Sequence, residues 1–301
     1  MEWESIYRNG LEISMNLLEK YKKYSGYYPL CDGGRQALLE AAEKICADGR
    51  LVAEVLEFRT KLANVPDEPA FRQIEKELKG KSAQFGAFLY TLLIGHMERV
   101  YEQKSIPRDI FGATVQEMTT CINQHYDRFG EWGLSDYETI GQLIGNVFML
   151  GRLQFEMWHY VSETPPEVLA LNLSEGDCIL DVHIPSGGRL TEADCLDSFE
   201  RAKEFFPKYL DYNFKAFGCE TWLFDPILKM LLPPESNILM FQGLFKIYKT
   251  YEDYDGLNFI FENVTRENIA DAPTDTSLRR AIVKHILSGG IMRCGAGYRL
   301  V

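Results

Sequence analysis

The sequence lacks the patterns that mark several classes of protein. Its seven cysteines are scattered without a C-x-x-C pair, and an odd, dispersed set indicates neither a disulfide framework nor a zinc site. We therefore expect reduced thiols, a cytoplasmic location and no metal. Aspartate and glutamate (44) outnumber lysine and arginine (32), the net charge is −12, and no basic stripe occurs, so nucleic acid is not an expected partner.

Long hydrophobic runs are absent as well. The most apolar stretch, FGAFLYTLLIG at residues 85–95, is interrupted by Gly95 and His96 and followed by Glu98. It is too short to cross a bilayer and predicts a buried helix. The start of the chain, MEWESIYRNGLEIS, is acidic and amphipathic and has no secretory-signal pattern. A membrane is therefore not an expected partner.

What the chain has is the composition of a folded protein. It has 301 residues, of which 46% are hydrophobic and 25% charged, enough for two domains with their own cores. Up to about residue 150 the apolar residues recur at helical spacing, as in Phe111, Val115 and Met118. The segment 135–138, Ser-Asp-Tyr-Glu, has the pattern of a capping box that opens another helix. Residues 1–150 are predicted to form a helical bundle.

After Gly151 the period changes to that of strands. The segments RLQFEMWHYV (152–161), EVLALNL (167–173) and DCILDVHI (177–184) predict an antiparallel meander with one solvent-facing side. A helix follows, capped by Thr191. The remaining predicted elements are a strand FGCETWLF, a helix from Asp225-Pro226, strands NILMFQGLFKIYKT and LNFIFENV, and a helix SLRRAIVKHILS. This order predicts an α+β domain over residues 151–301.

Four segments of the second half carry a more specific resemblance. They are LGRLQFE (150–156), VHIPSGGRLT (182–191), TWLFDPIL (221–228) and SNILMFQ (236–242). Together with the order of elements, they resemble a bacterial family of two-domain acyltransferases with a helical N-terminal domain and a GNAT-like C-terminal domain. The resemblance implies a helical domain at 1–150 and a mixed, mainly antiparallel sheet flanked by helices at 151–301.

The resemblance also implies an acyl-coenzyme A donor, acetyl-CoA or another acyl-CoA. The strand at 177–184 would line its pantetheine arm, and the loop at 185–190 would wrap its pyrophosphate. Amide groups at a helix start and close-approaching glycines suit an anion. The implied cofactor-binding residues are Ile184, Ser186, Gly187, Gly188 and Arg189.

The loop departs from the ordinary GNAT pattern, which is Arg or Gln, two residues, Gly, any residue, and Gly or Ala. Here the two glycines are adjacent and follow Pro185-Ser186, while Glu192 and Asp194 in the first turn of the helix repel phosphate. The loop by itself therefore leaves anion binding and simple chain reversal equally open.

Acyl transfer to an amine needs a base, donors for the oxyanion and an acid for the leaving thiolate. His183 is the first candidate for the base, because it titrates near neutral pH and lies near the end of the implied donor strand. Asp181 shares its strand face, and Glu156 on the neighbouring strand could orient it or act as the base. The alternative is that all three are solvated residues on the polar face of a sheet.

Other residues are weaker candidates. Arg152 and Trp222 are predicted to contact the substrate; Arg152 could bind a carboxylate or phosphate, or tie the two domains together. Tyr248 lies near the expected position of the thiolate's acid. Cys219 is a conceivable acyl carrier, with a buried structural thiol as the favoured alternative.

The sequence thus predicts an acyl-CoA-dependent acyltransferase acting on an amine of a small-molecule or peptide acceptor, and is compatible with an oligomer. Two alternatives stay open. One is a non-catalytic GNAT-like ligand-binding or interaction protein. The other is a hydrolase using Ser186, which lacks a G-x-S-x-G context.

Overall fold

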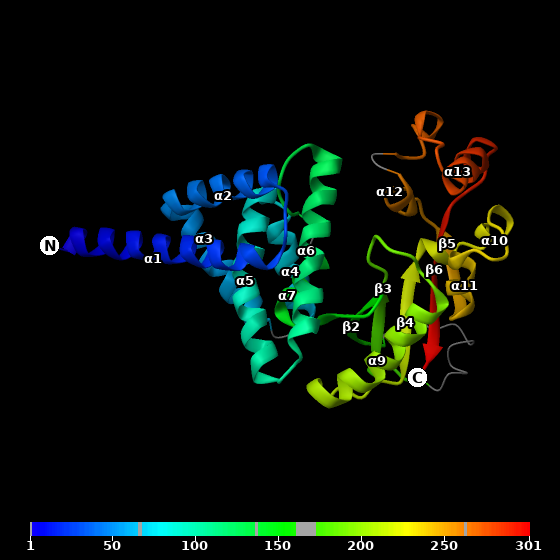
Figure 1. The fold of residues 1–301 in the computed structure, drawn as a ribbon, viewed down its shortest axis with the longest axis horizontal. Helices are drawn as coiled ribbons and strands as arrows, with labels where there is room; N and C mark the ends of the chain where they lie inside the picture. The colour runs from blue at the N-terminus through cyan, green and yellow to red at the C-terminus, as the bar shows by residue number, and fades with distance from the viewer. Residues whose placement is uncertain (1, 66–67, 136–137, 161–172, 262–263) are drawn as a thin grey trace. The chain divides into compact units, whose positions relative to one another are not determined.

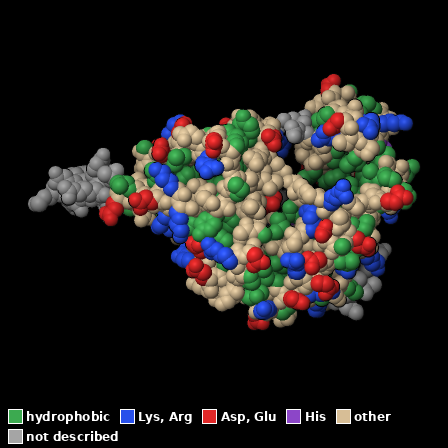
Figure 2. Space-filling view, viewed as in Figure 1, with side chains coloured by type: hydrophobic (Ala, Val, Ile, Leu, Met, Phe, Trp, Pro, Cys, Tyr) green, Lys and Arg blue, Asp and Glu red, His purple; other side chains and the backbone are tan. Residues whose placement is uncertain are grey.

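The computed structural model describes residues 2–65, 68–135, 138–160, 173–261 and 264–301 (Figure 1). The chain divides into two compact units, Met1–Phe148 and Met149–Val301. On the face shown in Figure 2, acidic and basic side chains are interspersed rather than gathered into patches. Among the described helices, none is long and apolar enough to span a membrane.

The first unit is helical, as predicted. Its elements are α1 (Glu2–Tyr24), the 3-10 turn η1 (Ser25–Tyr27), α2 (Asp32–Ala47), α3 (Gly49–Ala63), α4 (Glu68–Leu78), α5 (Ala83–Gln103), α6 (Arg108–Phe129) and α7 (Glu138–Ile144). Helix α5 contacts α1, α2, α3, α6 and α7 and is buried on most of its circumference, which confirms the buried helix expected at 85–95. The predicted capping box includes residues 136 and 137, which lie outside the described residues.

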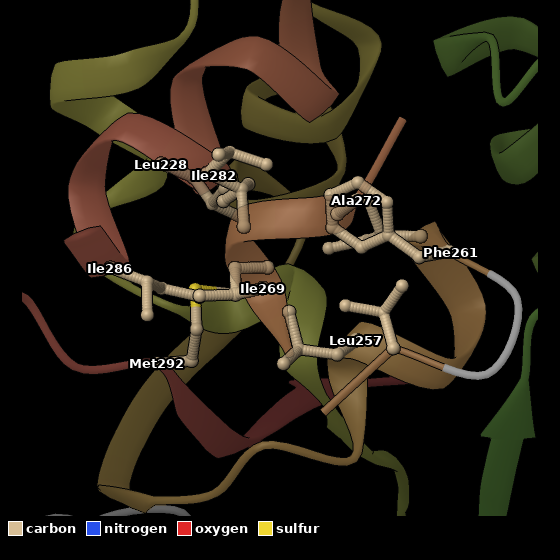
Figure 3. Close-up of a cluster of buried hydrophobic side chains, with 11 residues drawn as sticks. Leu228, Leu257, Phe261, Ile269, Ala272, Ile282, Ile286 and Met292 are labelled. Atoms are coloured by element: carbon tan, nitrogen blue, oxygen red, sulfur yellow. The ribbon is translucent and has the colours of Figure 1, made fainter. Parts of the chain in front are cut away.

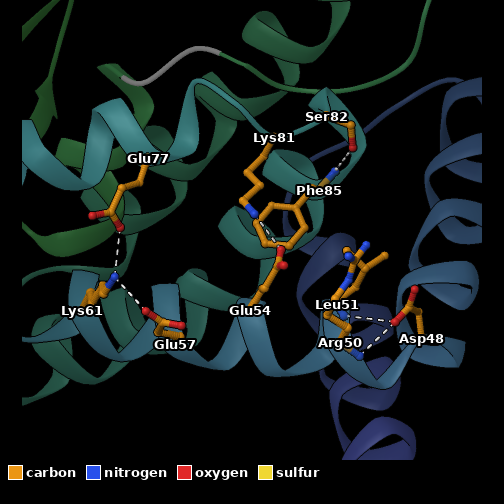
Figure 4. A network of polar contacts seen from close by, with 10 residues as sticks. All are labelled: Asp48, Arg50, Leu51, Glu54, Glu57, Lys61, Glu77, Lys81, Ser82 and Phe85. Atoms are coloured by element: carbon orange, nitrogen blue, oxygen red, sulfur yellow. Dashed lines mark hydrogen bonds and ion pairs between the residues drawn. The ribbon is translucent and has the colours of Figure 1, made fainter.

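Charged side chains stabilise the edge of this unit where α3, α4 and α5 meet (Figure 4). Lys61 Nζ lies 2.8 Å from Glu57 and 2.9 Å from Glu77, and Lys81 Nζ lies 2.7 Å from Glu54. A cavity of about 300 Å³ opens beside Lys81 and Phe85. None of the predicted site residues lines it; they belong to the second unit.

The second unit is built on a mixed sheet in the order β1-β2-β3-β4-β6-β5. The strands are β1 (Val147–Leu150), β2 (Leu153–His159), β3 (Cys178–His183), β4 (Ala216–Thr221), β5 (Lys246–Glu252) and β6 (Arg293–Leu300). The β3–β4 pair is parallel, and the β2–β3, β4–β6 and β5–β6 pairs are antiparallel. The predicted α+β fold with a mainly antiparallel sheet is confirmed.

One face of the sheet is covered by α9 (Glu192–Leu210). Alternation along each strand directs Phe155 and Phe217 to this face, where the ring of Phe199 lies 6.0 Å and 4.7 Å from them, centroid to centroid. Thr191 caps the helix, because its hydroxyl accepts from the Asp194 N–H at 3.2 Å. The opposite face of the sheet carries the polar residues of β2 and β3.

Short helices complete the second unit. They are η2 (Trp222–Phe224), α10 (Leu228–Leu231), α11 (Asn237–Gly243), α12 (Gly256–Ile260), η3 (Ile269–Asp271) and α13 (Ser277–Leu287). Apolar side chains of α10, α12, η3 and α13 form a separate buried cluster (Figure 3). Phe261, Ile282 and Met292 belong to it.

Three of the predicted late strands differ from the structure. The FGCETWLF strand ends at Thr221 and turns into η2. Residues 237–243, predicted as strand, form α11, because the Ser236 hydroxyl caps the Ile238 N–H at 3.3 Å. The segment 257–264 begins as α12, whose apolar residues are buried in the helical cluster rather than in the sheet. The strand predicted at 167–173 lies, up to residue 172, outside the described residues.

Candidate active site

The sheet opens between β3 and β4. Their parallel ladder joins only Ile179–Asp181 to Ala216–Gly218, although β3 continues to His183 and β4 to Thr221. On their outer sides both strands remain paired, β3 with β2 and β4 with β6. Within the described sheet, the ladder between these two strands therefore ends before the strands themselves do.

Three polar side chains meet beside this opening. Glu156 on β2 and Asp181 on β3 are direct cross-strand partners, and His183 lies two residues beyond Asp181 on the same face. His183 Nε2 is 2.9 Å from Glu156 Oε2 and 4.0 Å from Asp181 Oδ2. The structure thus brings together all three residues that the sequence nominated for catalysis.

The protonation of this cluster follows from its contacts. An ionised carboxylate can only accept a hydrogen bond, so His183 Nε2 is the donor in its contact with an ionised Glu156. Burial raises the pKa of Asp181; the His183 side chain opposes that rise, and the charges of Glu156 and Glu220 add to it. An imidazolium at His183 would be stabilised by two neighbouring carboxylates.

Tyrosine side chains extend the same sheet face across β4 to β6 and β5. Tyr248 and Tyr298 stack with centroids 5.3 Å apart, and Gly218 separates Tyr298 from Asp181. A Cβ at Gly218 would lie 3.3 Å from the Tyr298 ring and 3.6 Å from Asp181 Oδ1, so glycine permits this close packing. Burial, with Glu220 and other neighbours, raises the pKa of Tyr248.

Sequence reasoning missed Gly218, Glu220 and Tyr298. Glu220 accepts a hydrogen bond from the Tyr251 hydroxyl on β5. Glu220 and Tyr298 lie on strands β4 and β6, which are far apart in the chain. The alternation of residues along FGCET and GAGYRL could have assigned them to strand faces, but only the strand order places those faces beside Asp181.

The glycine loop follows directly from β3. Residues 186–189 are exposed, and Gly187 (φ +81°) and Gly188 (φ +68°) both adopt the left-handed conformation that favours glycine. The loop ends at Thr191, the cap of α9. Ser186, Gly187, Gly188 and Arg189 therefore stand together at the start of a long helix, and Ile184 joins them to the strand.

Arg152 lies against this loop from the start of β2. Its Nε donates to the Arg189 carbonyl oxygen at 3.2 Å, and its backbone N–H donates to the Ser198 hydroxyl of α9 at 2.8 Å. Trp222, the other predicted substrate contact, packs partly buried against the helical cluster and has no described contact with Glu156, Asp181 or His183. The structure thus associates Arg152 with the loop and Trp222 with packing.

The remaining candidates have structural explanations. Cys219 is buried, and burial raises the pKa of its thiol well above the usual value, which suits a structural thiol rather than an acyl carrier. Asp225 is fully buried and accepts from the Ile227 and Arg293 N–H groups at 2.9 and 2.7 Å. Among the described histidine, cysteine, aspartate and glutamate side chains, Glu156, Asp181 and His183 form the group whose three ligand atoms lie within 4.8 Å of one another, a spacing that could hold a metal ion.

Comparison with protein families identifies both parts of the chain. Residues 147–299 match the GNAT-like C-terminal domain, and residues 30–138 match the N-acyltransferase N-terminal domain. The resemblance drawn from the four sequence segments is therefore confirmed. No protein of curated function matches the sequence.

Solved structures of similar fold include several acyltransferases. One in complex with decanoyl-CoA is 20% identical, with a TM-score of 0.68 over 90% of this chain and 88% of that one. Another in complex with decanoyl-CoA and teicoplanin is 19% identical, with a TM-score of 0.64 over 89% of this chain and 99% of that one. A mutant acyltransferase in complex with octanoyl-CoA is 19% identical, with a TM-score of 0.65 over 93% of this chain and 94% of that one. At these identities the likeness is one of fold.

Proposed function

The chain belongs to the family of acyltransferases with a GNAT-like C-terminal domain, and from this premise we propose that it transfers an acyl group from acyl-CoA to an amine of a small-molecule acceptor. In this proposal residues 151–301 form the acyltransferase domain and residues 1–150 a helical domain. The observation that carries the proposal is the layout of β3, which bears the candidate base at its end and leads straight into the glycine loop.

The donor site follows from that layout. The pantetheine arm would enter the opening between β3 and β4 and pair with the strand edges freed beyond Asp181 and Gly218. The pyrophosphate would meet the exposed residues 186–189, which lead into the start of α9. Acyltransferases of similar fold that bind decanoyl-CoA and octanoyl-CoA support a donor of this type.

The reaction then uses the cluster beside the opening. The acceptor attacks as a neutral amine, and His183 takes the one proton that its nitrogen loses, while Glu156 and Asp181 stabilise the imidazolium. The amine nitrogen bonds to the thioester carbonyl carbon, and collapse of the tetrahedral intermediate breaks the C–S bond. The thiolate of CoA leaves and is protonated, and the product is an amide.

The proton that the thiolate needs is already held by His183. Burial raises the pKa of Tyr248 and makes its hydroxyl a weaker acid, whereas an imidazolium is a stronger acid than a thiol. We therefore assign the return of the proton to His183 rather than to Tyr248. In the similar acyltransferase solved with teicoplanin, an acyl-CoA and a second organic molecule are bound to one protein of this fold, which supports a small-molecule acceptor.

Two measurements test the proposal. Calorimetric titration with acetyl-CoA should give saturable binding, and a thiol-release assay with a panel of amines should show turnover. The variant His183→Ala should lose at least about a hundredfold in kcat with an unchanged Kd for acetyl-CoA, in line with the usual contribution of a general base. Binding without thioester consumption in any amine mixture would favour the non-catalytic ligand-binding protein instead.

A further inference from the structure

One guanidinium nitrogen of Arg152, Nε, is hydrogen-bonded to the glycine loop, and the two terminal nitrogens are not. Its Nε donates to the Arg189 carbonyl oxygen at 3.2 Å, and the Cβ position of Gly188 is 3.9 Å from the same nitrogen. Within the described residues, its two terminal nitrogens have no hydrogen-bond or ion-pair partner. A guanidinium presents its donors in a rigid fork, so fixing Nε also fixes the direction of the other N–H groups.

The backbone at Arg152 is equally well fixed. Its N–H donates to the Ser198 hydroxyl at 2.8 Å, and that hydroxyl is fully buried in the side of α9 that carries the loop at its start. Arg152 is therefore attached at both its backbone and its side chain to the element that would hold the phosphates. Such attachment lowers the entropy lost when a ligand is bound.

The acidic side chains near the loop would repel a phosphate unless positive charges offset them. Glu192 and Asp194 lie in the first turn of α9, where they oppose a phosphate. Asp194 is engaged locally, since its carboxylate accepts from the Thr191 hydroxyl at 2.5 Å. Arg189 is exposed on the loop itself and supplies one positive charge, and Arg152 supplies a second from the neighbouring strand. The two arginines together balance the two acids.

We propose that Arg152 is a donor-binding residue, which holds the pyrophosphate of acyl-CoA against the loop at 185–190 and selects pyrophosphate-bearing thioesters over thioesters without it. This inference rests on the proposed function. The inference also extends the proposed function to the choice of donor. A thioester on a carrier protein's phosphopantetheine arm has a single phosphodiester, so it would leave the guanidinium of either Arg152 or Arg189 without a partner.

The test compares three ligands in three variants. Acetyl-CoA and acetyl-dephospho-CoA carry the pyrophosphate and are titrated by calorimetry; S-acetylpantetheine carries no phosphate, and its weak binding is followed by an NMR titration. Arg152→Met removes the charge, and Arg152→Lys retains it without the fork. Arg201→Met is the matched control, since Arg201 lies on α9 with its side chain near Gly151 but is already paired with Asp197 at 2.6 Å.

Arg152→Met should raise the Kd of acetyl-CoA and acetyl-dephospho-CoA by roughly 10- to 100-fold, the usual loss for a charge-assisted contact, and leave that of S-acetylpantetheine unchanged. Arg152→Lys should recover part of the loss, and Arg201→Met should match the wild type. An equal loss for all three ligands would make Arg152 a structural residue and overturn the inference, as would an unchanged Kd. A wild-type protein that binds none of the three would refute the proposed function itself.

Discussion

Replacement of Ser198 by alanine should destabilise the second unit and loosen the donor loop together. The Ser198 hydroxyl is fully buried, accepts from the N–H groups of Arg152 and Leu153 at 2.8 and 3.3 Å, and donates to the Asp194 carbonyl at 2.8 Å. It thus joins the start of β2 to the first turns of α9. Ser198→Ala deletes this oxygen and leaves two N–H groups without an acceptor.

The loss in stability can be worked out from the two N–H groups that lose their acceptor. A buried polar group left without its partner costs about 1–3 kcal/mol, so two partly relaxed N–H groups should cost about 2–4 kcal/mol in the free energy of unfolding. For a unit of the size of Met149–Val301, that corresponds to a fall in Tm of about 5–15 °C. Because Arg152 is one of the two groups released, the KM for acyl-CoA should rise as well.

Urea and thermal unfolding of the wild type and Ser198→Ala measure the effect. The matched control is Ser288→Ala, since the exposed Ser288 hydroxyl donates to the His285 carbonyl at 2.7 Å and its loss leaves only groups that water can reach. The control should change the free energy of unfolding by about 0.5 kcal/mol or less. If Ser198→Ala is as stable as this control, the reasoning that Ser198 satisfies two buried N–H groups is wrong.

Three further outcomes are expected. Phe217→Ala should cost about 3–5 kcal/mol by urea unfolding, because Phe217 is fully buried 4.7 Å from the ring of Phe199; a loss below 1 kcal/mol would contradict this packing. In the native protein at pH 8, Cys219 should resist iodoacetamide while the exposed Cys31 reacts, because burial raises the pKa of the Cys219 thiol. Mass spectrometry of the alkylated peptides measures both reactions. Burial also raises the pKa of Asp181 in the folded protein above its value of about 3.9 in the unfolded chain. The free energy of unfolding should therefore fall as the pH rises from about 3.9 through the raised pKa of the folded state. Asp181→Asn should therefore be more stable than the wild type at pH 7 and equally stable near pH 3, and a constant difference across this range would refute the assignment.

Local sequence signals predicted the part of the fold that carries the proposed site. The alternation in residues 177–184, the two adjacent glycines and the Thr191 cap each act over a few residues, so β3, the loop and α9 could be read directly. The same local reasoning failed at α11 and α12. Both are short apolar runs, which periodicity cannot distinguish from strands, and their burial depends on contacts with distant segments.

The candidate site was predictable to the same extent. Alternation along the strand at 177–184 predicted that Asp181 and His183 share a face. The direct pairing of the Glu156 strand with it did not follow from the predicted meander, which would place the strand at 167–173 between them. Glu220 and Tyr298 could not be placed, because β6 from the end of the chain pairs between β4 and β5. The placing of Arg152 against the glycine loop also depends on the packing of β2 on α9, which no local pattern encodes.

The pairing of Glu156 with Asp181 bears on whether the cluster acts as the proposed site or is a solvated surface. Two carboxylates directly opposite each other on paired strands repel, and burial of Asp181 adds to that cost. A polar sheet face under no other constraint would be more stable with an opposite charge or a neutral residue at either position. In the proposed function both charges have a use, because both carboxylates face one imidazole, at 2.9 and 4.0 Å. The arrangement costs stability in the resting protein and favours the imidazolium that acyl transfer would generate.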